Sequence, residues 1–201
     1  MIKKTLIFIT IIFVTLITTY ALKLLLFKPF SFNHFLTRQL VYDALESPEY
    51  LTYIGILEKY GYRSYNGKLS DYSLEKDVQD LKKLKKEYKI LNSYKNEELS
   101  AEELTSKKIS LFQMRNEIDQ KTKYPYHAYP LIQMNGFHTS ILEFMTDIHP
   151  IKDEKDAKYY LSRLEMISLV FSQILEKMEK RKNLKIFPPT FMVERVIGQI
   201  E

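Results

Sequence analysis

The chain has 201 residues, which is enough for one domain or for one domain with an appendage. It contains no cysteine, and this excludes disulfides, thiolate zinc sites and a cysteine nucleophile. The net charge of +5 arises near the N-terminus, because removing Lys3, Lys4, Lys23 and Lys28 from the 30 basic residues leaves the rest close to neutral against 25 acidic residues. A body without excess positive charge argues against a nucleic-acid partner.

The beginning of the chain has the pattern of a membrane helix. No charged residue occurs from Thr5 to Leu22, and the apolar run resumes after Lys23 and ends at Phe27. At ~1.5 Å per residue the uncharged run reaches about 27 Å, close to the thickness of the hydrocarbon core of a bilayer. We therefore predict an N-terminal transmembrane helix marked by Thr5, Leu22 and Phe27, within an anchor formed by residues 1–28.

Two fates of this segment remain open. Positive and aromatic residues at its end favour a retained anchor, whereas a cleaved signal peptide needs small residues at the cut, of which Thr19-Tyr20-Ala21 is a weak version. The two lysines at its start favour an N-terminus on the inside. We expect a single-pass membrane protein with the lipid bilayer as a partner and the body on the outer face; in a bacterial cell this would be the inner membrane and the periplasmic face. Secretion after signal cleavage is the alternative.

The remainder of the chain, residues 29–201, predicts one all-α domain. Capping residues and apolar residues at spacings of three and four mark its helices. The predicted helices cover 31–46, a short stretch from Pro48, 74–91, 100–118, a long stretch from Asp153, and 190–199. The third and fourth of these helices should form an antiparallel hairpin across the polar turn between them. The glycine-containing residues 55–73 predict a structured loop without phosphate-binding spacing.

An extended strap is predicted over residues 124–136. Tyr124 and Tyr129 each precede a proline, which restrains them to extended geometry, and we expect the strap tyrosines to pack onto the helices. Gln133 and Asn135 are polar residues among apolar neighbours. Their amides either satisfy the backbone of the strap itself or face a substrate cleft in the complete protein.

A succession of motifs in the second half carries a resemblance. The motifs are Tyr129-Pro-Leu-Ile-Gln-Met-Asn-Gly136, Leu142-Glu-Phe-Met145 with His149-Pro150, Asp153 through Asp156-Ala-Lys-Tyr-Tyr-Leu-Ser-Arg-Leu164, and Phe187-Pro-Pro-Thr-Phe-Met-Val193. In this order and spacing they resemble the N-terminal half of the bacterial domain-of-unknown-function family 885. Lys28-Pro-Phe-Ser-Phe-Asn33 and Leu45-Glu-Ser-Pro-Glu49 are similar to its membrane-anchored or exported branch.

The resemblance implies an all-α, zinc-metallopeptidase-like hydrolase. In full-length relatives the implied zinc site lies in the C-terminal half, where helix histidines bind zinc and a glutamate activates water. This chain contains no His-Glu pair, so no metal ligand can be carried over. We therefore expect the N-terminal part of a larger family domain, inactive alone, and leave its assignment as an enzyme open. Its partner would be a missing C-terminal half or another protein; the alternative is a complete, non-enzymatic, membrane-tethered interaction module.

The residues themselves predict no active site. The histidines, His34, His127, His138 and His149, are never three or four apart, so no helix presents two of them on one face. We predict no catalytic, cofactor-binding or metal-binding residue in this chain.

Overall fold

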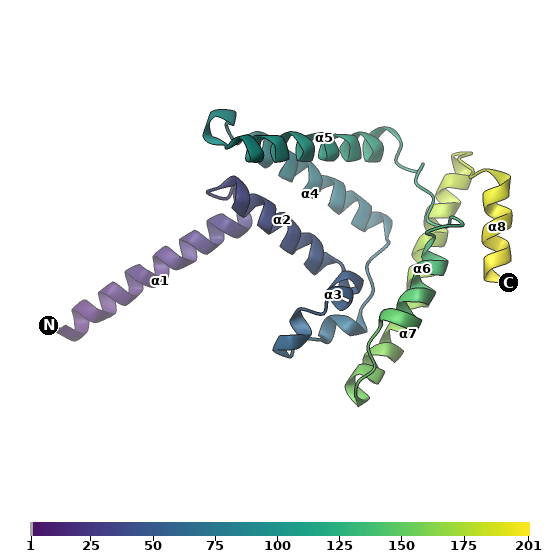
Figure 1. Cartoon of the computed structure of the whole chain (residues 1–201), viewed down its shortest axis with the longest axis horizontal. Coiled ribbons are helices and arrows are strands. Elements are labelled where there is room, and N and C mark those ends of the chain that lie inside the picture. Colours follow the sequence, from purple (N-terminus) through teal and green to yellow (C-terminus); the bar gives the residue numbers. More distant parts are fainter. Residues whose placement is uncertain (1) are drawn as a thin grey trace. The chain divides into compact units, whose positions relative to one another are not determined.

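The computed structural model describes the backbone of residues 2–201 and the side chains of residues 9–23 and 27–201. All regular elements in this part are helical, so the predicted all-α class is confirmed (Figure 1). The α-helices are α1 Ile2–Leu26, α2 Phe32–Glu46, α3 Pro48–Ile54, α4 Leu74–Asn92, α5 Ala101–Lys123, α6 Phe137–Glu143, α7 Glu154–Asn183 and α8 Thr190–Ile200. Between them lie the 3₁₀ helices η1 Leu57–Tyr60, η2 Ser64–Gly67 and η3 Asn96–Glu98, and the π-helical turn η4 Phe144–Ile148.

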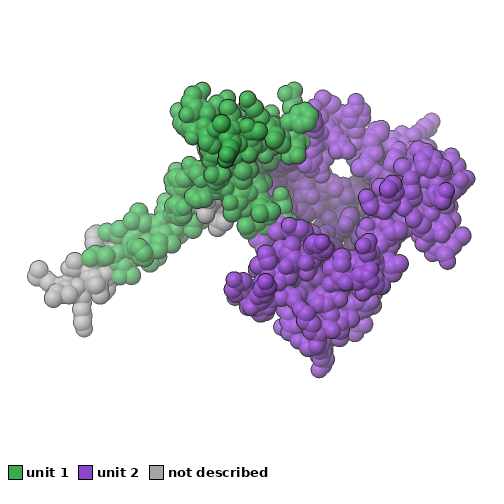
Figure 2. Space-filling model, in the orientation of Figure 1, with its two compact units in different colours: residues 1–43, 85–115 green, residues 44–84, 116–201 purple. Residues whose placement is uncertain are grey.

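The chain forms two compact units (Figure 2). Unit 1 comprises residues 1–43 and 85–115, and unit 2 comprises residues 44–84 and 116–201. All three boundaries fall inside helices, so α2, α4 and α5 each contribute residues to both units. Each unit has a hydrophobic cluster of its own.

The core of unit 1 joins α2 to the turn between α4 and α5. Phe32 and Phe35 of α2 pack against Leu91 and Tyr94, and the ring centroids of Phe32 and Tyr94 lie 5.9 Å apart, edge to face. Partly buried side chains of α4 and α5 cover this cluster: Ile90, Leu111 and Met114. Within unit 1, α4 and α5 therefore fold back on each other, as the predicted hairpin requires.

The membrane span predicted near the N-terminus is not supported. Among the described side chains, no helix is long and apolar enough to cross a bilayer. Of the three predicted markers, Leu22 and Phe27 are exposed, and the side chain of Thr5 lies outside the described ones.

The core of unit 2 lies between α6, η4 and α7. Its buried members are Leu69, Phe137, Ile141, Phe144, Met145, Val170 and Ile174. The apolar stretch from Ile141 to Met145 begins in α6 and continues into the wider π turn, where the amide of His149 donates to the carbonyl of Phe144 at 2.9 Å. The π turn brings His149 toward α7, where it contacts Arg163.

The predicted loop over 55–73 is structured and packs closely on α7. It contains η1 and η2, and the C-terminal residue of η2, Gly67, lies so near α7 that an added Cβ would stand 2.9 Å from Cδ1 of Tyr159. The hydroxyl of Ser162 donates to the carbonyl of Gly67 at 3.0 Å. This close approach, which only glycine allows, lets α7 reach the backbone carbonyls of the loop.

Polar side chains begin the helices where the sequence predicts them. Ser31, Ser47 and Asp153 accept hydrogen bonds from the amides of His34, Tyr50 and Asp156. The capping box of α5 is reciprocal: the amide of Ser100 donates to Glu103 at 3.0 Å, and the amide of Glu103 donates to Ser100 at 3.2 Å. These local contacts set the boundaries of α2, α3, α5 and α7.

Candidate functional site

A cavity of about 390 Å³ lies in unit 2 beside the strap formed by residues 124–136. Its walls come from the N-terminal turns of α4, the end of α5, the strap and the C-terminal half of α7. The lining residues are Tyr72, Leu74, Asp77, Val78, Leu81, Gln120, Lys121, Tyr124, Pro125, Tyr126, Ala128, Tyr129, Pro130, Ile174, Lys177, Lys180 and Arg181. A cavity of this volume is large enough for a small organic molecule.

Arg181 of α7 fixes the strap over this cavity. Its Nε donates to the carbonyl of Tyr126 at 2.8 Å, and its Nη2 donates to the carbonyl of Ala128. A second attachment comes from the hydroxyl of Tyr129, which donates to the carbonyl of Phe187 at 3.0 Å. The strap is thus attached at two places. Its backbone carbonyls bond to Arg181 near the C-terminal end of α7, and the hydroxyl of Tyr129 bonds to the segment that follows α7.

The cationic side chains around the cavity differ in whether a carboxylate balances them. Lys177 forms a 2.6 Å ion pair with Asp77. Lys180 instead places its Nζ 5.4 Å from the ring centroid of Tyr126, and its pKa is raised, first by a hydrogen bond with that hydroxyl. Burial lowers the pKa of Arg181, which is only 8% exposed.

Arg163, in the middle of α7, is the most deeply buried large side chain of unit 2, at 0% exposure. Its Nη2 donates to the hydroxyl of Thr52 at 2.7 Å and to the carbonyl of Tyr65 at 3.1 Å, and its Nε donates to the carbonyl of Lys68 at 2.8 Å. Its guanidinium also lies 4.8 Å from the ring centroid of Phe144. One side chain therefore connects α3, η2, η4 and α7.

Burial lowers the pKa of Arg163 to about 10, which leaves the guanidinium charged at neutral pH. Its Nη1 lies 2.7 Å from Nδ1 of His149, and since a guanidinium only donates, Nδ1 accepts. Burial, and then the charge of Arg163, lower the pKa of His149. His149 is therefore a neutral acceptor in this arrangement.

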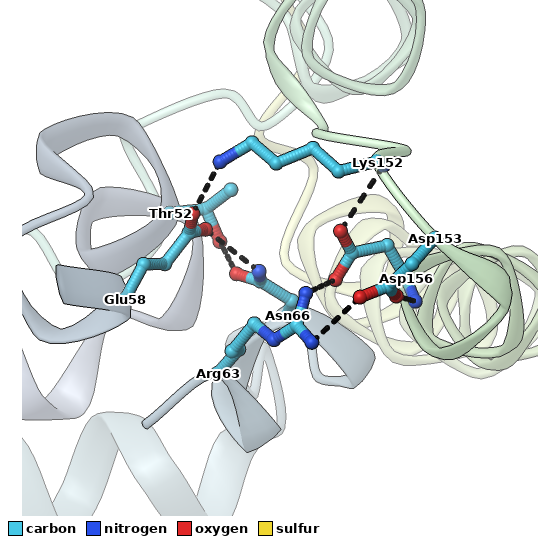
Figure 3. A network of polar contacts seen from close by, with 7 residues as sticks. All are labelled: Thr52, Glu58, Arg63, Asn66, Lys152, Asp153 and Asp156. Carbon is cyan, nitrogen blue, oxygen red and sulfur yellow. Dashed lines mark hydrogen bonds and ion pairs between the residues drawn. The ribbon is translucent and has the colours of Figure 1, made fainter. Parts of the chain in front are cut away.

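A second polar network joins η1 and η2 to the start of α7 (Figure 3). Arg63 donates to Asp156 at 2.9 Å and to Asp153 at 2.7 Å. The network continues from Lys152 through Glu58 and Asn66 to Thr52, with donor–acceptor distances of 2.7–2.9 Å. Although burial raises the pKa of Glu58, the hydrogen bonds from Lys152 and Asn66 outweigh it and hold that pKa below its usual value. These carboxylates are engaged in protein contacts, which suits a structural role.

The histidines do not come together. His149 contacts Arg163, His138 lies 3.0 Å from Oε1 of Gln199, and His127 packs edge-on to Tyr124. Within the described residues, no group of three or more histidine, aspartate or glutamate side chains is arranged to hold a metal ion. The residues present therefore do not fit the zinc that the family resemblance implies for full-length relatives, and no chemical step is derived through it.

A family model for a bacterial protein of unknown function (DUF885) matches residues 48–201. The chain belongs to this family. The match includes the cavity, both networks and α8. A search of curated proteins and a search of solved structures found no match.

Gln133 and Asn135, whose amides were predicted either to satisfy the backbone of the strap or to face a cleft, lie in the DUF885 match but outside the lining of the cavity. Asn135 is exposed. Gln133 is half-buried; its carbonyl accepts from Gln199 at 2.9 Å, while its side-chain Oε1 is buried without a hydrogen-bond partner among the described residues. Their role in a cleft stays a prediction.

Arg163 and Arg181 were not identified as important from the sequence. In the DUF885 chain each is one of many basic residues on a long helix, and Arg181 stands in a basic run that suits the helix C-terminus on its own. The sequence offered one indication for Arg163, which is its place next to Tyr159, Tyr160 and Ser162 on a part of α7 that faces the core. Its partners, however, lie about a hundred residues earlier in the chain.

Proposed function

We propose that this chain is a non-catalytic helical scaffold of a DUF885 protein, forming one wall of a larger assembly. Further helical polypeptide of the same protein, or of a partner, would cover α7 and α8. Any zinc hydrolase chemistry of the family would belong to that other part. The alternative is a complete, non-enzymatic interaction module. In that case the same surface of α7 and α8 would bind a different protein rather than further DUF885 polypeptide.

The observation that carries this proposal is an exposed apolar surface on α7 and α8. On α7, Leu161, Leu164 and Leu175 are 58%, 43% and 56% exposed, and their spacing places them on one side of the helix. The exposed apolar residues of α8 are Phe191, Val193, Ile197 and Ile200. Apolar surface gathered in this way is typical of a protein–protein contact.

The polar residues support a structural role. The buried Arg163, His149 and Thr52 bond one another, and Arg63, Asp153 and Asp156 bond across the start of α7. A catalytic group needs a face toward substrate with hydrogen-bonding capacity to spare. The interior of unit 2 instead uses most of its polar groups to join its own segments.

Co-purification tests the scaffold proposal. The natural gene and its neighbours are read for a DUF885 segment with a His-Glu motif, and that segment is expressed together with the full chain. We expect a stable complex that Leu164→Glu with Leu175→Glu disrupts, whereas Lys158→Glu, a change to an exposed charge on the same helix, preserves it. Absence of a complex with every such segment, while circular dichroism shows the chain folded, rejects the assembly.

Lipid contact through α1 is a second proposal, supported by exposed apolar side chains along that helix. Examples are Ile9, Phe13, Leu16 and Ile17, at 58%, 63%, 64% and 52% exposure. Flotation of the full chain with anionic vesicles tests it. Phe13→Lys with Leu16→Lys should abolish flotation, and Lys158→Glu should not; equal flotation of the two variants rejects a contact through α1.

A further inference from the structure

Arg181 has one guanidinium nitrogen that the fold leaves without an acceptor. The Nε and Nη2 atoms bond the carbonyls of Tyr126 and Ala128. The Nη1 atom is buried and has no hydrogen-bond partner in the described part of the protein. A buried donor on a charged group is costly to leave without an acceptor, and Arg181 lines the cavity, so this nitrogen points to a missing acceptor.

The charge of the cavity wall points to an anion. Of its cations, Lys177 is balanced by Asp77 at 2.6 Å and Lys121 lies 3.5 Å from Glu117. Neither Lys180 nor Arg181 has an ion pair with any residue that the structure describes. An anion in the cavity would supply both the absent acceptor and the absent negative charge.

The rest of the wall suits an apolar body attached to that anion. Tyrosine rings and aliphatic side chains form most of it: Tyr72, Leu74, Val78, Leu81, Tyr124, Tyr129 and Ile174. Burial raises the pKa of the Tyr72 hydroxyl, and its ring packs edge-on to Phe137 with centroids 5.1 Å apart. A largely apolar wall with few charged groups is typical of a site for a small organic molecule.

We propose that the cavity between the strap, α4 and α7 binds a small organic carboxylate. Arg181 Nη1 and Lys180 hold the carboxylate, and the tyrosine and aliphatic side chains contact its apolar body. Because Arg181 also holds the carbonyls of Tyr126 and Ala128, the bound anion and the strap share one guanidinium. Binding therefore stabilises the strap in its observed position.

Titration of the full chain with simple anions tests the site. The probes are benzoate, its neutral analogue benzamide, and inorganic phosphate, followed by calorimetry and by ¹⁵N NMR shifts. We expect benzoate to bind with shifts in residues 124–130 and 174–181, and benzamide not to bind. Arg181→Gln should weaken benzoate binding about tenfold or more, the value of one charge-assisted hydrogen bond. Lys182→Gln, on the next and exposed residue, should leave binding unchanged.

Arg181→Lys provides a second variant if Arg181→Gln fails to fold. It keeps the charge but loses the planar donor geometry, and we expect weaker benzoate binding in a chain with the wild-type circular dichroism spectrum. Three results overturn the proposal: no benzoate binding to the wild-type chain, undiminished binding by the folded variant, or shifts outside the strap and α7. Phosphate binding as tight as that of benzoate overturns the organic carboxylate and assigns a simple anion site.

Discussion

Arg38 in unit 1 and Arg163 in unit 2 are both buried, yet only Arg38 meets a carboxylate. Arg38 lies 2.6 Å from Glu87, and the two side chains are 4% and 7% exposed. Arg163 donates to carbonyls, a hydroxyl and an imidazole, and forms no ion pair with the residues described. The two buried arginines of this protein are thus stabilised in different ways, one by a carboxylate and the other by neutral acceptors.

The difference follows from what each arginine joins. The pair in unit 1 connects α2 with α4, and the carboxylate of Glu87 balances the charge of Arg38, which also donates to the carbonyl of Phe27. Arg163 connects α3, η2 and η4 to α7, and most of its acceptors are backbone carbonyls, which carry no charge. Unit 1 therefore depends on a matched pair, and unit 2 on a donor with several neutral partners.

The largest expected effect comes from removing the shared donor. Arg163→Met fills part of the same space but leaves the acceptors of Thr52, Tyr65 and Lys68 buried and unpaired. At about 1–3 kcal/mol for each unsatisfied group, partly relieved by local movement, we expect a loss of about 4 kcal/mol in the free energy of unfolding. Urea denaturation measures it, and hydrogen exchange should locate the loosening in unit 2.

Arg195→Met is the matched control, because Arg195 lies exposed on α8. It should change the free energy of unfolding by less than about 0.5 kcal/mol. If Arg163→Met were as stable as this control, the buried guanidinium would not be the connection that holds unit 2 together.

The second effect tests the matched pair of unit 1. Glu87→Gln leaves the charge of Arg38 buried without its carboxylate and should cost about 3 kcal/mol. Replacing both residues, as Arg38→Met with Glu87→Leu, should restore most of that loss, since an apolar pair has no charge to balance. Urea denaturation of the single and double variants gives the coupling. A double variant no better than Glu87→Gln would contradict the pairing.

The contrast also separates what the sequence could predict from what it could not. The caps of α2, α5 and α7 depend on residues within four positions of one another, and the helix starts predicted at 31, 100 and Asp153 coincide with them. The contacts of Arg163 span about a hundred residues, so no local pattern distinguishes it from other basic residues of α7. The cavity is equally non-local, because α4, α5, the strap and α7 each supply one wall.

The strap shows the same limit on a smaller scale. Its prolines predicted an extended strap, but residues 125–126 and 133–135 form turns, in which the amides of His127 and Gly136 donate to the carbonyls of Tyr124 and Ile132. The carbonyls of Tyr126 and Ala128 accept from Arg181. The expectation that all its tyrosines pack inward was wrong for Tyr124, which is 57% exposed, while Tyr126 and Tyr129 are half-buried. Local sterics at the prolines exclude a continuous helix here, but the turns and the direction of each ring depend on contacts with other segments.

A smaller effect is expected at the helix caps. Ser100→Ala removes one hydrogen bond of the capping box in unit 1 and should cost about 1 kcal/mol. Asp153→Ala in unit 2 removes the cap of α7 and also a partner of Arg63, so we expect the larger loss there. Thermal unfolding compares the two. Equal losses would mean that the contact in Figure 3 between Arg63 and Asp153 adds nothing to the cap.

The smallest effect is a dependence on pH that only unit 2 should show. Burial and the charge of Arg163 lower the pKa of His149 from the ordinary 6.5, although Asp156 and Glu58 oppose this. The unfolded chain therefore takes up this proton at a higher pH than the folded chain. The stability that neutral His149 provides is present above about pH 6.5 and is lost as the pH falls through the folded pKa.

His149→Asn keeps an oxygen acceptor for Arg163 but does not titrate, so its free energy of unfolding should fall less between pH 7.5 and 5. His127→Asn, a change outside this network, should follow the wild-type slope. If His149→Asn also follows the wild-type slope, protonation of His149 does not weaken the interior of unit 2, and Arg163 would tolerate a charged neighbour.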